Sequence, residues 1–140
     1  MHVHLTRLND AVHFRAVTPH STVDMDGSAK VGGEGKGPLP TELVIAALGG
    51  CTGIDVVDIL RKQKLTITSF EITLSATRQQ DVVPSLFETI HVKFILDGNI
   101  KPEHARRAVA LSFDKYCTVA KILEKSAVIS HSIVLNGKEI

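Results

Sequence analysis

The segment GPLPTELVIAALGGCTGIDVVDIL, residues 37–60, predicts the central element of the fold. Pro40 suits the first turn of a helix, and Glu42 suits the positive end of the helix dipole. Apolar residues then occupy nearly every side of the helix predicted over residues 39–63. Because a helix that is apolar all round is usually buried, we expect this one to run through the middle of the protein.

Three glycines, Gly49, Gly50 and Gly53, surround one cysteine, Cys51, in this helix. Each glycine costs a helix about 1 kcal/mol relative to alanine. Small residues allow either close packing of the helix or open space beside the thiol. Close packing explains the glycines without needing the cysteine, and the sequence leaves both interpretations open.

Alternation of apolar and polar residues predicts strands on both sides of the helix. The expected strands are a hairpin over 2–17, a third strand over 21–26, two strands over 69–76 and 86–96, and a last strand over 127–135. This order indicates an α+β fold with antiparallel sheet, in a single domain spanning residues 1–140. One sheet leaves part of an apolar helix uncovered, so we expect a homodimer.

A glycine-rich segment, residues 27–38, precedes the helix and shows no hydrophobic period. Its composition predicts a mobile loop that acts as a lid or an entrance. It carries neither the P-loop spacing nor the dinucleotide-binding spacing, which argues against a phosphate cradle.

A second helix is predicted from Pro102, and Cys117 follows its apolar stripe. That helix either continues through Cys117 or ends there, and in the second case the dipole of a new helix would stabilise a Cys117 thiolate. Two buried helices with one cysteine each can bring thiols within disulfide reach, so that a sulfenic acid formed on one condenses with the other. Asp55, one turn from Cys51, disfavours a thiolate there. A reactive Cys51 therefore needs a cation, for which Arg15 is the candidate.

Composition limits the other classes of function. Sixteen basic and 15 acidic residues nearly cancel, which argues against nucleic acid or an anionic membrane as partner. The N-terminus has no apolar signal-peptide core, and no run of about 18 apolar residues predicts a membrane span. We therefore expect a cytoplasmic protein. Its two cysteines lie outside any C-x-x-C pattern, so no zinc-finger or thioredoxin spacing is present, and we predict no cofactor and no resident metal.

Residues 37–60, followed downstream by DKYCTVAKILEK at residues 114–125, resemble the OsmC/Ohr superfamily of osmotically inducible and organic hydroperoxide resistance proteins. The likeness covers nearly the whole chain and points to a less-characterised OsmC-like branch. The resemblance implies an OsmC-like fold, in which antiparallel sheets wrap around long central helices of an intertwined homodimer. It places the active sites at the dimer interface.

The same resemblance implies a thiol peroxidase that reduces organic hydroperoxides. Cys51 matches the peroxidatic cysteine and Cys117 the resolving one, and a dithiol reductant such as a lipoyl protein would reopen their disulfide. The hydroperoxidase members carry Asn-Pro-Glu before the first cysteine; here that glutamate position is Thr41, and Glu42 follows it. Glu42 and Arg15, near the first hairpin, are therefore the candidates for the remaining catalytic residues.

Other functions remain open at this stage. The apolar pocket could bind an acyl-type ligand, with the thiols redox-active only incidentally, and such binding would survive Cys51→Ser. His2, His4 and His13 lie on neighbouring strands and could bind zinc or copper. No histidine stands at a recognisable spacing from Cys51, which argues against a cysteine hydrolase. Asp55 and Asp58 are expected to contact the pocket or the dimer partner, because buried carboxylates need partners.

Overall fold

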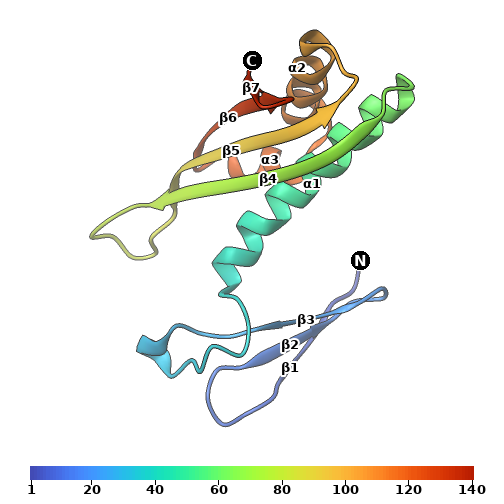
Figure 1. Ribbon diagram of the computed structural model, residues 1–140. Coiled ribbons are helices and arrows are strands. Elements are labelled where there is room, and N and C mark those ends of the chain that lie inside the picture. Colours follow the sequence, from blue (N-terminus) through green and yellow to red (C-terminus); the bar gives the residue numbers. More distant parts are fainter. The chain divides into compact units, whose positions relative to one another are not determined.

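The computed structural model describes all residues from Met1 to Ile140, which form two compact units (Figure 1). The N-terminal unit is Met1–Val44 and the C-terminal unit is Ile45–Ile140. Helix α1, Pro40–Lys62, begins in the first unit and continues in the second. The predicted helix over residues 39–63 is thus confirmed to within one residue at each end.

The N-terminal unit contains a three-stranded antiparallel sheet in the order β1-β2-β3. The strands are β1 (His4–Arg7), β2 (Phe14–Val17) and β3 (Thr22–Met25), which confirms the predicted hairpin and third strand. The β1–β2 turn is closed by Asn9, whose Oδ1 accepts hydrogen bonds of 3.1 Å from the backbone N–H groups of Ala11 and His13. An asparagine that replaces a backbone acceptor in this way is a common turn former.

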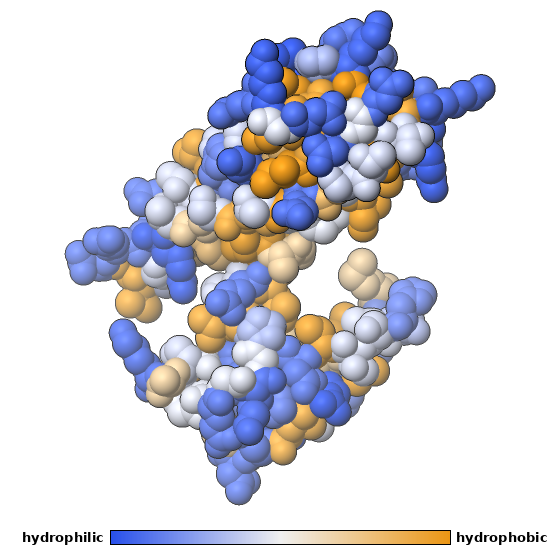
Figure 2. All heavy atoms as spheres, in the orientation of Figure 1, coloured by the Kyte–Doolittle hydropathy of each residue, from blue (hydrophilic) through white to orange (hydrophobic).

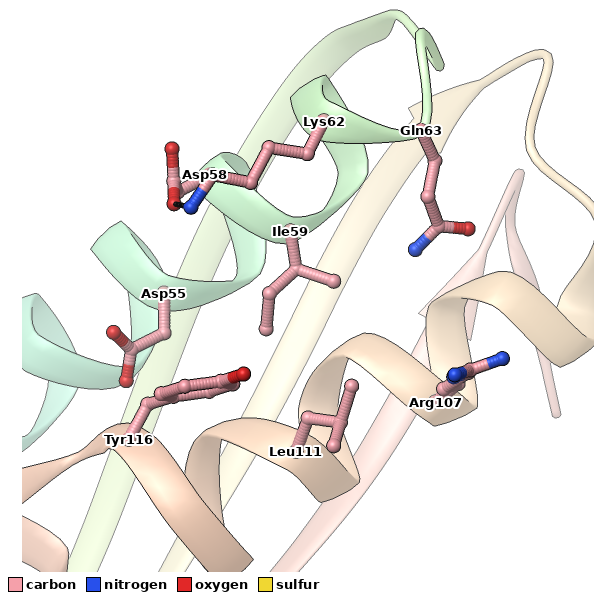
Figure 3. A pocket seen from close by; sticks show the side chains of 8 residues that line it. All are labelled: Asp55, Asp58, Ile59, Lys62, Gln63, Arg107, Leu111 and Tyr116. Carbon is pink, nitrogen blue, oxygen red and sulfur yellow. Dashed lines mark ion pairs between the residues drawn. The ribbon is translucent and has the colours of Figure 1, made fainter.

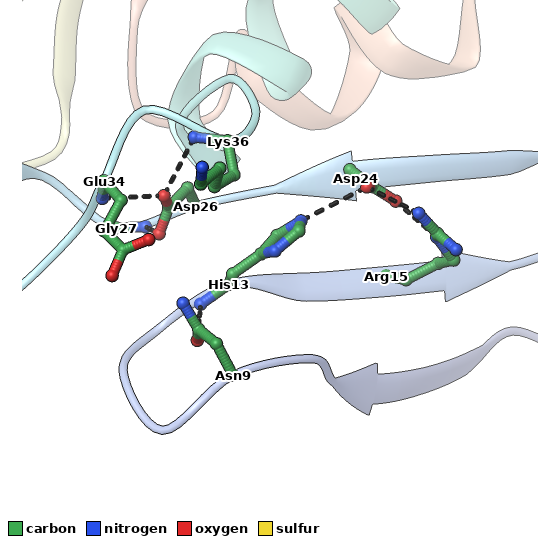
Figure 4. Close-up of polar contacts among 8 residues, drawn as sticks. All are labelled: Asn9, His13, Arg15, Asp24, Asp26, Gly27, Glu34 and Lys36. Atoms are coloured by element: carbon green, nitrogen blue, oxygen red, sulfur yellow. Dashed lines mark hydrogen bonds and ion pairs between the residues drawn. The ribbon is translucent and has the colours of Figure 1, made fainter.

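The glycine-rich segment is organised around the carboxylate of Asp26 (Figure 4). Asp26 is 2 % exposed and accepts three backbone hydrogen bonds, from Gly27 at 2.8 Å, Glu34 at 2.9 Å and Lys36 at 3.0 Å. A short 3-10 turn, η1 (Ala29–Val31), lies inside the segment. One acidic side chain thus satisfies backbone donors that would otherwise stay free, and the role of this loop as a mobile lid or entrance stays a prediction.

The C-terminal unit contains a four-stranded sheet in the order β4-β5-β6-β7. Its strands are β4 (Ile67–Arg78), β5 (Phe87–Gly98), β6 (Val128–Leu135) and β7 (Lys138–Glu139). The α+β class is confirmed, and β4–β5 and β6–β7 are antiparallel. The pair β5–β6 is parallel, a pairing that alternation within each strand could not reveal. Parallel neighbours require a long crossover connection, here the segment that carries the remaining helices.

Three helical segments form that crossover. Helix α2 (Pro102–Leu111) starts at the predicted proline, a π-helical turn η2 (Ser112–Tyr116) follows, and α3 (Thr118–Leu123) begins after Cys117. Cys117 has extended backbone angles and is the N-cap of α3. The structure thus decides between the two alternatives left by the sequence: a new helix begins at this cysteine.

The glycines of α1 serve two different purposes. A Cβ on Gly49 would lie 2.7 Å from Leu74 Cδ1, and a Cβ on Gly53 would lie 2.7 Å from Ile72 Cδ1, both in β4. These two glycines therefore let the helix pack closely on the sheet. A Cβ on Gly50 would meet nothing within 4 Å, so this glycine faces open space.

An apolar core fills the C-terminal unit. Phe94 is its largest fully buried side chain. It stacks on Phe70 and meets Phe113 edge-on, with ring centroids 6.3 and 6.1 Å away. Buried positions of α1 in this core include Leu48, Val56 and Leu60. However, Ile54 of α1 is 72 % exposed, which agrees with the expectation that one sheet leaves part of this apolar helix uncovered in the single chain. Figure 2 shows hydrophobic side chains at the surface of both units.

By length and composition alone, α1 could cross a membrane. The central helices of soluble proteins meet the same criterion, and α1 packs on a sheet through Gly49 and Gly53. The helix is therefore explained as a core element of the fold.

Candidate functional site

Two cysteines that are far apart in the sequence come together with a carboxylate. The Sγ atoms of Cys51 and Cys117 and one carboxylate oxygen of Asp55 all lie within 4.8 Å of one another. Cys51 and Asp55 are one turn apart on α1, and Cys117 is the N-cap of α3. Both thiols are free. We call these three side chains the sulfur cluster.

The backbone holds Cys117 firmly in this place. Its N–H donates to the carbonyl of Ser112 at 2.8 Å, and its Sγ accepts a hydrogen bond of 3.3 Å from the N–H of Ala120. An N-cap side chain that accepts a hydrogen bond from the N–H group three residues later satisfies one of the free backbone donors at the start of a helix. Cys117 thus takes the place of the usual serine or aspartate cap. In this position its sulfur lies close to Cys51 and Asp55 of α1.

The two sulfurs differ in accessibility. Cys117 is fully buried, whereas Cys51 is half-buried. Burial, the neighbouring Cys51 thiol and the charge of Asp55 raise the pKa of Cys117, against the opposing effect of the Ala120 N–H. Cys117 is therefore a protonated thiol at neutral pH, and Cys51 is the sulfur that a solute reaches first.

Asp55 is held by a buried hydroxyl. Ser112 Oγ, which has no exposed surface, donates a hydrogen bond of 2.8 Å to Asp55 Oδ2. Ser112 continues the apolar stripe of the second predicted helix, and its contact with Asp55 was not predicted from the sequence. The available signal was a polar residue within that stripe, since a buried hydroxyl needs a partner.

Asp55, which belongs to the sulfur cluster, also lines a pocket (Figure 3). Its volume is 440 Å³. It lies between α1 and the α2–η2 segment and is lined by Asp55, Asp58, Ile59, Lys62, Gln63, Arg107, Leu111 and Tyr116. The expectation that both aspartates would reach a pocket is confirmed. Apolar side chains form part of the wall, and charged groups of both signs form its rim.

Asp58 is the paired carboxylate of this pocket. It forms ion pairs with Lys62 at 2.5 Å and with Arg61 at 2.7 Å. Hydrogen bonds from Lys62 and then Arg61 lower the pKa of Asp58. In contrast, Asp55 has no cationic partner within salt-bridge distance.

Arg15 lies in the N-terminal unit, paired with Asp24 (Figure 4). Its Nε and Nη2 donate to the two carboxylate oxygens at 2.6 and 2.8 Å, and His13 Nε2 lies 3.2 Å from Asp24 Oδ2. The hydrogen bond from Arg15 is the main cause that lowers the pKa of Asp24 to about 2. The guanidinium thus has a bidentate partner, and the catalytic role of Arg15 stays a prediction.

Glu42 lies in the first turn of α1, where its Oε2 accepts a hydrogen bond of 2.7 Å from the N–H of Leu39. It therefore caps its own helix, and its catalytic role also stays a prediction. Of the three histidines considered for metal binding, His13 contacts Asp24. None of the three belongs to a group of potential metal ligands within reach of one another; the sulfur cluster is such a group.

Comparison with known proteins defines the family. The family model described as OsmC-like protein matches residues 33–132. Protein YhfA of Escherichia coli K12 is 44 % identical over 98 residues, which cover 69 % of this chain and 72 % of that protein. The chain therefore belongs to the OsmC-like protein family, as the sequence resemblance predicted.

Solved structures agree on the fold. A hypothetical protein from Aquifex aeolicus VF5 is 28 % identical, with a TM-score of 0.81 and coverage of 96 % of both chains. The organic hydroperoxide resistance protein OsmC from Legionella pneumophila is 14 % identical, with a TM-score of 0.73 and coverage of 96 % of this chain and 97 % of that one. The OsmC-like fold is thus shared across a wide range of sequence divergence.

Proposed function

We propose that this protein is a thiol-dependent peroxidase that reduces organic hydroperoxides through Cys51 and Cys117. The observation that carries the proposal is the approach of two free thiols, one half-exposed and one buried, within 4.8 Å. A disulfide bond of about 2.05 Å then requires the two sulfurs to move closer together on oxidation. The shared fold with proteins named for organic hydroperoxide resistance supports the substrate class.

The reaction proceeds in two steps. The Cys51 thiolate attacks the distal oxygen of the hydroperoxide, the O–O bond breaks, and the alkoxide leaves as an alcohol after taking up a proton. Cys51 is then a sulfenic acid. Cys117 attacks its sulfur, water leaves, and a disulfide joins the two residues. Two electrons and two protons from a dithiol reductant, such as a lipoyl protein, restore the thiols.

The pocket that Asp55 lines suits an organic peroxide. Ile59, Leu111 and Tyr116 provide an apolar wall beside Asp55 for an alkyl chain. In this proposal Arg15 supplies the cation that favours the Cys51 thiolate, and Glu42 orients that guanidinium. Arg15 would have to exchange its partner Asp24 for the reacting groups.

We also propose that the working form is a cytoplasmic homodimer. Gly50, Ile54 and Val57 form an uncovered face of α1, with a hollow of 460 Å³ against Phe70 and Ile72. Exposed apolar surface with a small residue at its centre suits close packing of a second helix. Ile54→Lys should then yield a monomer in sedimentation velocity, and an unchanged sedimentation coefficient would contradict this assembly.

The decisive test is the mass and the free-thiol count of the reduced protein after one equivalent of an alkyl hydroperoxide. Loss of two thiols with a mass decrease of about 2 Da is expected. Cys117→Ser should accumulate a trappable sulfenic acid on Cys51, and Cys51→Ser should consume no peroxide. Cys117→Ser also serves as the matched control, because it leaves the attacking sulfur in place.

A second candidate is a binding protein for acyl-type ligands, which the size of the 440 Å³ pocket favours. It predicts that both thiols survive the peroxide treatment. It also predicts that a fluorescent fatty acid binds equally well to the wild type and to Cys51→Ser.

A further inference from the structure

The carboxylate of Asp55 is unexplained by peroxide chemistry. One of its carboxylate oxygens lies within 4.8 Å of both sulfurs. Asp55 also lacks the cationic partners that Asp58 has in Lys62 and Arg61. A carboxylate that stands beside two thiols, without a cation to neutralise it, indicates that a cation is to be bound there.

The donor set identifies the kind of cation. Two sulfurs and one carboxylate oxygen suit a borderline-soft ion and not magnesium or calcium, which prefer oxygen ligands. In a tetrahedral zinc site with bonds of about 2.3 Å to sulfur, the two sulfurs lie about 3.8 Å apart. The present limit of 4.8 Å on all three separations requires only small side-chain rotations to reach that geometry.

Neighbouring groups already hold the ligands in place. Ser112 Oγ donates to Asp55 Oδ2, which leaves Oδ1 free to bind, and the Ala120 N–H donates to Cys117 Sγ. Such outer hydrogen bonds orient ligands in metal sites. Cys51 is half-buried, so a fourth position stays open to water, as in zinc sites with three protein ligands.

We infer that Cys51, Asp55 and Cys117 of the reduced protein bind one zinc ion, with water as the fourth ligand. Each thiol loses its proton to solvent when its sulfur binds the metal. The site does not depend on peroxidase activity. If the proposed function also holds, zinc and peroxide compete for the same sulfurs, so that bound zinc protects the reduced pair from oxidation.

The test is zinc binding by the full-length, reduced, chelator-treated protein, measured in competition with a chromophoric chelator. One zinc per chain is expected. Cys51→Ser, Cys117→Ser and Asp55→Asn should each weaken binding by at least about 100-fold, and Ser112→Ala by about 10- to 100-fold. Asp58→Asn is the matched control, because it removes the next carboxylate along α1 outside the cluster, and it should leave zinc affinity unchanged.

Cobalt(II) gives an independent readout, since sulfur ligands produce an intense near-ultraviolet charge-transfer band. Both cysteine variants should lose that band, and circular dichroism should verify that each variant is folded. Absence of stoichiometric zinc binding overturns the inference. It is equally overturned if zinc binding survives both cysteine variants but is lost in His4→Gln, which would assign the metal to the N-terminal histidines.

The two proposals fail in distinguishable ways. Peroxide consumption by the metal-free protein, without any zinc binding, would overturn the zinc site alone. Zinc binding by a protein whose thiols ignore peroxide would overturn the peroxidase alone.

Discussion

Each of the two units of this chain is stabilised internally by a different kind of interaction. In the N-terminal unit, Ala16 is the one apolar side chain that is buried, and the central buried group is the carboxylate of Asp26. The C-terminal unit has an extensive buried apolar cluster that includes Phe94, Leu48 and Val92. Polar side chains on backbone donors therefore organise the first unit, and hydrophobic burial organises the second.

This difference shows which apolar side chains of the single chain are left without a covering layer. Leu5, Val17 and Val23 of the first sheet are exposed in the single chain. A three-stranded sheet without a buried apolar face is only marginally stable by itself. These side chains are the part of the first sheet that a second chain of the proposed homodimer would cover.

The largest effect is expected from truncating the core of the C-terminal unit. Phe94→Ala should lower the free energy of unfolding by about 3–5 kcal/mol, because it leaves a cavity between Phe70 and Phe113. Leu5→Ala, at a half-exposed position in the N-terminal sheet, should change it by about 0.5 kcal/mol or less. Urea unfolding at fixed protein concentration measures both. Equal losses would mean that the first sheet acquires a core from another chain.

The next largest effect on stability is expected from replacing the glycines of α1, of which Gly53 packs on β4 and Gly50 faces open space. In the monomeric Ile54→Lys background, Gly50→Ala should stabilise the protein by about 0.5–1 kcal/mol, since alanine is the better helix former and the site is open in the single chain. Gly53→Ala must displace Ile72, and overpacking should leave it about 1–3 kcal/mol less stable than Gly50→Ala. Thermal unfolding compares the pair. With Ile54 intact, destabilisation by Gly50→Ala would show that a second chain packs on this face.

The sulfurs should differ in reactivity by a smaller factor. Iodoacetamide at pH 8 should alkylate Cys51 at least about tenfold faster than Cys117, because Cys117 is buried and its pKa is raised. The Cys117 rate should increase as the pH rises further, since the thiolate forms only above the ordinary range. Peptide mapping by mass spectrometry measures the two rates. Faster labelling of Cys117 would reverse the proposed order of attack.

The smallest effect is expected at low pH, where the N-terminal unit loses the stabilising contribution of the Asp26 carboxylate. Backbone hydrogen bonds, led by that of Lys36, lower the pKa of Asp26. A carboxyl whose pKa is lowered by folding stabilises the protein fully above its unfolded pKa of about 4, and this contribution is lost as the pH falls through the folded value.

The amide resonances of Glu34 and Lys36 should therefore shift as the pH falls below about 4, the ordinary pKa of an aspartate. Asp26→Asn should remove this dependence. Amide NMR spectra across the titration measure it. An unchanged titration in the variant would assign the transition to Asp24, whose pKa is about 2.

Elements with a strong local pattern could be predicted from the sequence. The apolar run with Pro40 at its start predicted α1, and alternation predicted the strands. The two buried segments allowed the cysteines to meet, and the resemblance to the OsmC/Ohr superfamily implied that they form a pair. The parallel β5–β6 pair could not be predicted, because alternation does not encode strand direction.

Side-chain contacts that depend on tertiary position were also beyond the sequence. Asp26 and Lys36 are ten residues apart, and Ser112 meets Asp55 across 57 residues. Arg15 and Asp24 face each other because of strand register, which residue types alone do not determine. The hydrogen-bond networks of both units could therefore not be predicted from the sequence, whereas their helices and strands could.

The parallel β5–β6 pair has a consequence for the order of folding. The β4–β5 hairpin joins neighbouring segments, whereas β6 can pair with β5 only after the whole intervening segment, residues 99–127, has been arranged. Contacts that are distant in sequence form late, because closing a long loop is entropically unfavourable. Cys117 lies within that segment, so its sulfur reaches Cys51 near the end of folding. A nascent chain therefore carries two separate thiols, and the pair exists as a unit only in the finished protein.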